Sequence, residues 1–108
     1  MLKVYTGTVR GKYANKLDIT VKSGEPAFAP TWEMVMDFKN GYTTPQQYTE
    51  IYKNRMRSSY LVYREKWDEL LSRDEVVLVC YCPKGQFCHR HILAKILVKL
   101  GAQYLGEK

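Results

Sequence analysis

One apolar segment, Val76–Cys82, constrains the fold of this chain more than any other feature. It reads VVLVCYC and has no polar alternation until its end. Because an alternating strand buries only one of its faces, an unbroken apolar run predicts a strand that is covered on both faces. Such strands are typical of parallel sheets flanked by helices. The segment therefore predicts the central strand of a small α/β sandwich whose sheet is largely parallel.

Shorter segments of the chain predict the partners of this strand. Leu2–Thr6 and the alternating Leu17–Lys22 are predicted as strands, and AQYLG near the C-terminus as a last one. Thr31 is placed to cap a helix over WEMVMDFK, and Thr44 is followed by Pro and Gln at positions that start another. A final amphipathic helix follows Cys88. The predicted order is therefore strand, strand, two or three helices, strand, helix, strand.

The helix that begins after Thr44 has two interpretations. Its apolar and aromatic side chains recur at helical spacing as far as Trp67, and the pattern ends near Ser72. Either one helix spans the whole segment, or two helices meet near Ser58–Ser59. We predict the break, because a helix of about 28 residues is rare in a domain of this size.

The length of 108 residues predicts a single domain over residues 1–108 with one core. No apolar run approaches the roughly 20 residues that a membrane-spanning helix needs, and the first residues lack the apolar centre of a secretory signal. We therefore expect a cytoplasmic protein without a membrane partner. Its three cysteines are an odd number, so they cannot all pair within the chain, and reduced thiols are expected.

The chain is basic, with 17 Lys and Arg residues against 11 Asp and Glu residues and a net charge of +6. A charge of this sign favours anionic partners, and a small anionic ligand is the partner that we expect. The alternative is a non-enzymatic basic module that binds nucleic acid or a partner protein. Most aromatic residues fall at helical spacing, which favours positions in the core over a stacking surface. The oligomeric state stays open.

The residues best suited to chemistry lie together in the segment Cys80–His91. Cys88 falls at the start of the last helix, where the positive helix end favours a thiolate and lowers the pKa of a thiol. Arg90, in the first turn, carries donors that can hold a carboxylate or phosphate in two places. His89 can exchange protons near neutral pH. The pattern predicts an anion-accepting thiol site at a strand–loop–helix junction.

These residue types divide into two predicted sets. The predicted catalytic residues are Cys88 as nucleophile or redox thiol, His89, Arg90, and Cys82 as a second or resolving thiol. The predicted substrate-binding residues are Arg90, Lys84, Gly85 and Gln86. A structural interpretation stands beside each role: Cys88 can fill an apolar gap, and Arg90 can pair with a carboxylate such as Asp37 or Glu107.

A metal site is the remaining interpretation of the cysteines. Cys80, Cys82, Cys88 and His89 offer four ligands, which is enough for a tetrahedral zinc ion. The spacing argues against it, because Cys-x-Cys on a strand is unlike the usual Cys-x2-Cys knuckle. The adjacent pair Cys88 and His89 would also have difficulty reaching one ion from a helix start. We therefore predict no metal and no cofactor, and keep a structural zinc as an alternative.

The segment VVLVCYCPKGQFCHRHILAKIL resembles the domain of unknown function 488 family. The hallmark of that family is a hydrophobic strand followed by a Cys-His-Arg tripeptide that opens a helix, and here the tripeptide is Cys88, His89 and Arg90. The strand VYTG and the segments FAPTWEMV and QYTEIYKNRM are also compatible with the family. The resemblance implies a site at the tripeptide and does not imply a particular activity.

The loop also has a weaker similarity to rhodanese-like and cysteine-phosphatase domains, in which a thiol loop surrounds an oxyanion. Cys82 would be the matching nucleophile. A phosphatase loop needs Cys-x5-Arg, whereas the sixth residue after Cys82 is Cys88 and Arg90 comes two positions late. We therefore expect a similarity of architecture only. From the thiol and arginine pattern, we expect thiol-dependent chemistry on a small anionic or phosphorylated substrate.

Overall fold

The computed structural model describes residues 1–83 and 85–108. Its elements in chain order are β1 (Lys3–Thr8), β2 (Lys16–Asp18), α1 (Trp32–Lys39), α2 (Pro45–Val62), α3 (Arg64–Leu71), β3 (Glu75–Cys80), α4 (His89–Lys99) and β4 (Gln103–Glu107). The strands form one sheet in the order β2-β3-β1-β4, and all three pairings are parallel. The prediction of an α/β fold with a parallel sheet is confirmed.

The central position of β3 follows from its apolar sequence. It lies between β2 and β1, and its last five residues are buried. On one face, Val76 and Leu78 join the core that the helices cover. On the other face, Val77 and Val79 are also buried. Gly7 is the β1 partner of Val79, and the ring of Tyr13 from the β1–β2 loop lies directly against this glycine.

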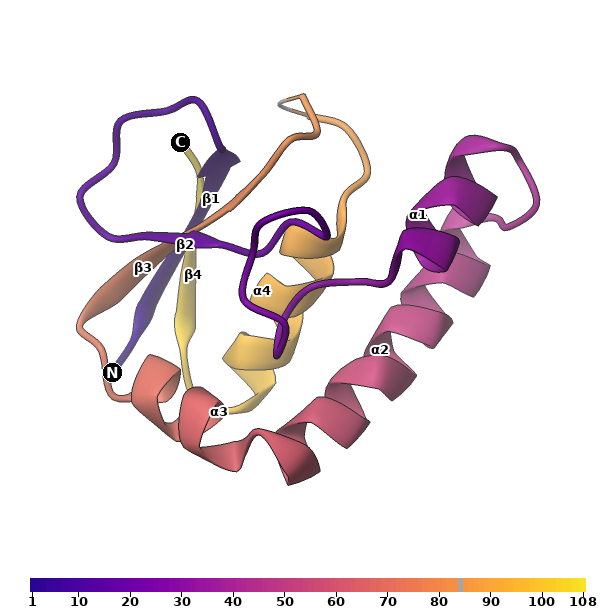
Figure 1. Ribbon diagram of the computed structural model, residues 1–108. Coiled ribbons are helices and arrows are strands. Elements are labelled where there is room, and N and C mark those ends of the chain that lie inside the picture. The colour runs from indigo at the N-terminus through magenta and orange to yellow at the C-terminus, as the bar shows by residue number, and fades with distance from the viewer. Residues whose placement is uncertain (84) are drawn as a thin grey trace.

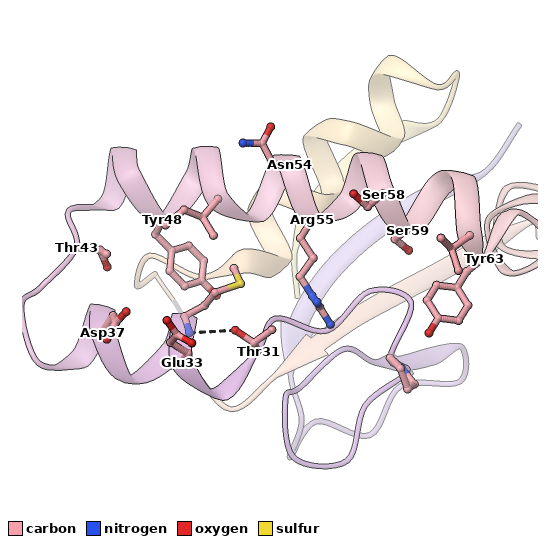
Figure 2. Close-up of a pocket in the computed structure, with 14 residues that line it drawn as sticks. Thr31, Glu33, Asp37, Thr43, Tyr48, Asn54, Arg55, Ser58, Ser59 and Tyr63 are labelled. Carbon is pink, nitrogen blue, oxygen red and sulfur yellow. Dashed lines mark hydrogen bonds between the residues drawn. The ribbon is translucent and has the colours of Figure 1, made fainter.

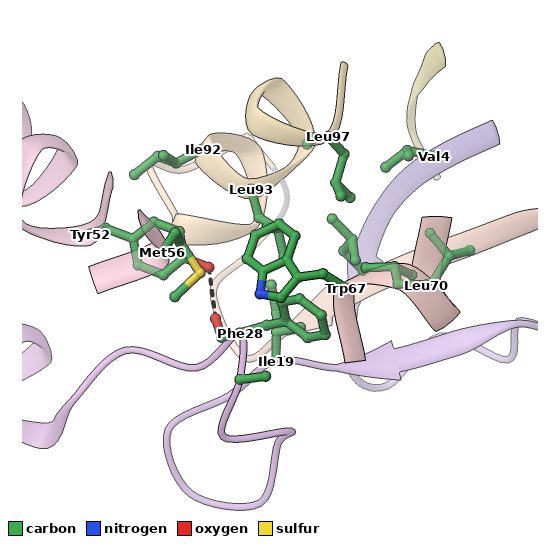
Figure 3. Close-up of a cluster of buried hydrophobic side chains, with 14 of the residues drawn as sticks. Val4, Ile19, Phe28, Tyr52, Met56, Trp67, Leu70, Ile92, Leu93 and Leu97 are labelled. Atoms are coloured by element: carbon green, nitrogen blue, oxygen red, sulfur yellow. Dashed lines mark hydrogen bonds between the residues drawn. The ribbon is translucent and has the colours of Figure 1, made fainter. Parts of the chain in front are cut away.

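The helices lie together on one side of the sheet (Figure 1). Helix α4 contacts β1, β3 and β4, and α2 packs against α4. Figure 3 shows the core between these layers, with the ring of Trp67 beside that of Phe28 at a centroid distance of 4.9 Å. The hydroxyl of Tyr52 donates to the carbonyl of Phe28 at 2.7 Å. This bond fixes the loop before α1 on the long helix α2.

The helix starts lie where the sequence predicts them. Thr31 caps α1, and Thr44 forms a capping box with Gln47 at the start of α2. The predicted break in the long helical segment exists, but it lies at Tyr63 instead of near Ser58–Ser59. Ser59 stays helical, and its buried hydroxyl donates to the Ala27 carbonyl in the loop before α1 and accepts from the indole N–H of Trp67.

The strand predicted at Leu17–Lys22 is shorter in the structure and ends at Asp18. The Asp18 carboxylate accepts hydrogen bonds from the backbone N–H of Thr20 and the hydroxyl of Ser23, which turns the chain away from the sheet. None of the helices in the described residues is long and apolar enough to span a membrane.

Candidate metal centre

The three cysteines come together at the C-terminal end of β3. Cys80 is the last residue of the strand, Cys82 follows in the loop, and Cys88 is the N-cap of α4. Their three sulfur atoms all lie within 4.8 Å of one another. The sulfurs of Cys80 and Cys82 are 3.9 Å apart. A strand end and a helix start thus place three thiols within reach of one ion.

The His89 ring lies next to two of these three thiols. Its Nδ1 lies 3.9 Å from the Cys80 sulfur and 3.7 Å from the Cys88 sulfur. Its Nε2 lies 2.6 Å from the carbonyl oxygen of Ile19, so Nε2 carries the proton and donates it there. The Nδ1 lone pair is therefore free on the side of the sulfurs.

Adjacency in the sequence does not keep the side chains of Cys88 and His89 apart, because the Cys88 sulfur and the His89 Nδ1 lie 3.7 Å from each other. Cys88 has an extended N-cap backbone, with φ −158° and ψ 149°, whereas His89 is the first helical residue. This change of backbone conformation between neighbours lets both side chains turn toward Cys80. In the sequence, the two residues look like consecutive positions of one helix, which would point in different directions.

Burial and charge differ among the three thiols. Cys80 and Cys88 are buried, and Cys82 is half-buried. Hydrogen bonds from Cys80 and Cys88, with a smaller contribution from nearby Arg90 and Lys39, lower the pKa of Cys82 to about 3 against the effect of burial. The same bonds, together with burial, raise the pKa of Cys88. These pKa directions favour the thiolate at Cys82, whereas the helix end alone predicted it at Cys88.

Arg90 has a different position from the one expected of a substrate clamp. The side chain is completely buried, and its guanidinium donates to Glu107 on β4 at 2.9 Å. It also donates to the carbonyl oxygens of Cys82 and Pro83 at 3.1 and 3.2 Å. The alternative in which Arg90 pairs with Glu107 is thus the observed one. Arg90 holds the cysteine loop in place and presents no exposed surface to a ligand.

The other predicted substrate-binding residues have separate positions. Gln86 lines a cavity next to the thiols. Gly85 has φ +84°, a left-handed conformation that favours glycine in the turn of the loop. Lys84 lies outside the described residues.

The cavity beside the thiols has a volume of about 390 Å³. The three cysteines and His89 form part of its wall, and Lys22, Lys39 and several aromatic rings form much of the remainder. A larger cavity, of about 600 Å³, lies between α1 and α2 (Figure 2). The described residues that line it include Glu33, Asp37 and Arg55 but none of the cysteines or histidines. The smaller cavity is therefore the one that belongs to the candidate site.

A family model matches most of the chain. The model of the active DUF488-N3 subclade, DUF488-N3a, matches residues 6–101 of the chain. The chain belongs to the DUF488 family. The match begins in the second half of β1 and includes the cysteine loop and all of α4, and so confirms the resemblance drawn from the Cys-His-Arg tripeptide. No curated protein and no solved structure matches the chain, so the rhodanese-like architecture stays a prediction.

Two residues of this candidate site in the DUF488 protein were not identified from the sequence. The carbonyl of Ile19 sets the orientation of the His89 ring, and Lys39 lies on the cavity wall near Cys82. Neither carries a signal in the sequence, because both positions depend on how β2 and α1 pack beside the loop. Glu107 was visible only as one of two carboxylates that could pair with Arg90.

The stability of this DUF488 protein should fall in acid as Glu107 is protonated. Burial would raise the pKa of Glu107, but hydrogen bonds from Arg90, Thr6 and His91 outweigh it and lower the pKa to about 2. A group with a lowered folded-state pKa stabilises the fold fully above its ordinary value of 4.5 and loses that contribution as the pH falls toward 2. The expected loss is about 3 kcal/mol.

Urea unfolding at a series of pH values measures this loss. Glu107→Gln should flatten the dependence of unfolding free energy on pH between 4.5 and 2. Glu69→Gln, at an exposed carboxylate that pairs with Arg73, is the control and should leave most of the slope in place. An unchanged slope in the Glu107 variant would contradict the assignment.

Proposed function

We propose that this protein binds a soft divalent metal ion, zinc above all, through the sulfurs of Cys80, Cys82 and Cys88 and the Nδ1 of His89. One observation carries the proposal: the spacing of these donor atoms. Zinc forms bonds of about 2.3 Å to sulfur and about 2.0–2.1 Å to nitrogen. In a tetrahedral complex, two sulfur ligands are therefore about 3.8 Å apart, and a sulfur and a nitrogen ligand are about 3.6 Å apart. Here the Cys80 and Cys82 sulfurs are 3.9 Å apart, and all three sulfurs lie within 4.8 Å of one another. The His89 Nδ1 is 3.9 Å from the Cys80 sulfur and 3.7 Å from the Cys88 sulfur.

The surroundings of His89 support the same proposal. Histidines that bind metals usually donate their second ring N–H to a carboxylate or a backbone carbonyl, which fixes the tautomer. The bond from Nε2 to the Ile19 carbonyl is of this kind. Thiolate and imidazole donors favour zinc over magnesium or calcium. A set of four protein ligands, three of them buried, is typical of a structural zinc that ties elements together.

Cobalt and zinc titrations of the reduced, metal-free protein test the proposal. One equivalent of Co²⁺ should give the visible bands of a tetrahedral thiolate complex, and one equivalent of Zn²⁺ should remove them. His89→Gln should weaken zinc binding by about 100-fold or more, since even residues that only support a ligand contribute 10–100-fold. His91→Gln is the matched control, because His91 lies two positions away and bonds to Glu107. Failure to bind cobalt, or equal effects of the two variants, would contradict the proposal.

The second candidate is thiol-dependent chemistry on a small anionic substrate. Cys82 is the half-buried thiol of the cluster, and it lines the cavity together with Lys39. In this reading Cys82, in place of Cys88, is the nucleophile, and Cys88 lies behind it as the resolving thiol. Alkylation of the metal-free protein, mapped by mass spectrometry, separates the two candidates. Rapid and selective reaction at Cys82 in a protein that does not bind zinc would favour this second function.

A further inference from the structure

The cavity next to the cysteine cluster is lined by aromatic side chains that a metal centre does not require. Exposed aromatic side chains gather around it: Trp32 is 57% exposed, Tyr81 58% and Phe87 38%. Phe87 packs on Phe38 at a ring-centroid distance of 5.1 Å, which holds it at the cavity wall. Single exposed apolar residues are common on proteins, but several around one concave site indicate a ligand.

Two lysines line the cavity, on the same wall as the Cys82 sulfur. Lys22 comes from the segment after β2, and Lys39 from the last turn of α1. Neither lysine belongs to the ion pairs formed within residues 1–83 and 85–108. The lining residues that the structure describes include no Asp or Glu. The cavity therefore favours a negatively charged group and offers it two ammonium donors that lack a carboxylate partner.

We infer that this cavity binds a small ligand that joins one anionic group to an apolar ring, such as an aryl carboxylate or an aryl phosphate. The anionic group would lie near Lys22 and Lys39, and the ring against Trp32 and Phe87. A volume of about 390 Å³ is enough for one such molecule. The inference goes beyond the metal centre, because these walls come from α1, the loop and the segment after β2.

The two tryptophans allow ligand binding in the cavity to be followed by fluorescence. Trp32 lies on the cavity wall and is exposed, whereas Trp67 is 1% exposed in the core. A ring that stacks on Trp32 should change the fluorescence of that residue and leave Trp67 unaffected. In Trp32→Phe the fluorescence change should disappear, while calorimetry still detects binding.

The experiment compares four probes on the reduced, zinc-loaded protein: phenyl phosphate, benzoate, inorganic phosphate and benzyl alcohol. At least one of the two ring-bearing anions should bind about tenfold more tightly than inorganic phosphate and benzyl alcohol, because only it uses both kinds of wall. The difference between phenyl phosphate and benzoate tells which anionic group the site prefers. Lys39→Met should weaken binding by about tenfold. Lys95→Met, on the exposed surface of α4, is the control and should not.

Three results would overturn the inference: no binding of either ring-bearing anion, binding of inorganic phosphate as tight as that of the better ring-bearing anion, or equal effects of the Lys39 and Lys95 variants. Zinc content, measured on the same samples, separates this inference from the proposed function. One zinc per chain without ring-anion binding removes the inference alone. Ring-anion binding by a chain that takes up no zinc removes the metal proposal alone.

Discussion

Zinc should raise the free energy of unfolding of the reduced protein by about 4 kcal/mol when free zinc exceeds its dissociation constant a thousandfold. The gain is large because the ion would link the end of β3 to the start of α4, and, through the His89 ring, to the segment after β2. Those segments meet only in the folded chain, so the unfolded chain has no comparable site. At about 4 °C per kcal/mol, the midpoint of thermal unfolding should rise by about 16 °C.

Thermal and urea unfolding, with either excess zinc or excess chelator, measure this effect. Cys88→Ser should lose the zinc-dependent increment, because one of three thiolate ligands is gone. His91→Gln should keep it, and so shows that the loss is specific to the cluster. Identical unfolding curves of the unmodified protein in zinc and in chelator would contradict zinc binding at this cluster.

Arg90→Met should lower the free energy of unfolding by about 3–5 kcal/mol at neutral pH. The substitution leaves Glu107 as a largely buried charge without its guanidinium partner, and it removes the donors to the carbonyls of Cys82 and Pro83. Breaking a buried pair from one side costs far more than the pair itself contributes, since the remaining charge stays out of water. The loop that carries Cys82 should therefore also become less ordered.

An exposed pair in the same chain provides the control. Arg73 and Glu69 form an ion pair on α3 and the turn after it, with exposures of 35% and 56%. Arg73→Met should cost no more than about 1 kcal/mol. The double variant Arg90→Met with Glu107→Gln should recover part of the loss, because it removes the orphaned charge. A cost for Arg90→Met no greater than that for Arg73→Met would mean that the buried pair does not hold the loop.

The fold was largely predictable because its signals are local. An unbroken apolar run gave β3, and the Thr31 and Thr44 caps gave the starts of α1 and α2. The helix break was misplaced by a few residues, because the helical state of Ser59 depends on a loop carbonyl and an indole that only tertiary structure brings to it. Local pattern cannot report such partners.

The candidate site was predictable in place and less so in chemistry. The strand–loop–helix junction is where the thiols gather, as the Cys-His-Arg tripeptide implied. The thiolate was predicted at Cys88 because the helix end was weighed alone, whereas hydrogen bonds among the three thiols lower the pKa of Cys82 and raise the pKa of Cys88. The metal interpretation was rejected on linear spacing, although the backbone at the N-cap decides whether Cys88 and His89 converge.

The ring of Tyr13 over Gly7 has a consequence for how this protein behaves at high concentration. Any β-carbon at position 7 would lie 2.7 Å from that ring and would displace it. The helix-free face would then expose apolar surface around Val79. Exposed apolar surface on a sheet promotes self-association. We therefore expect a variant with a side chain at position 7 to self-associate more readily than the unmodified protein.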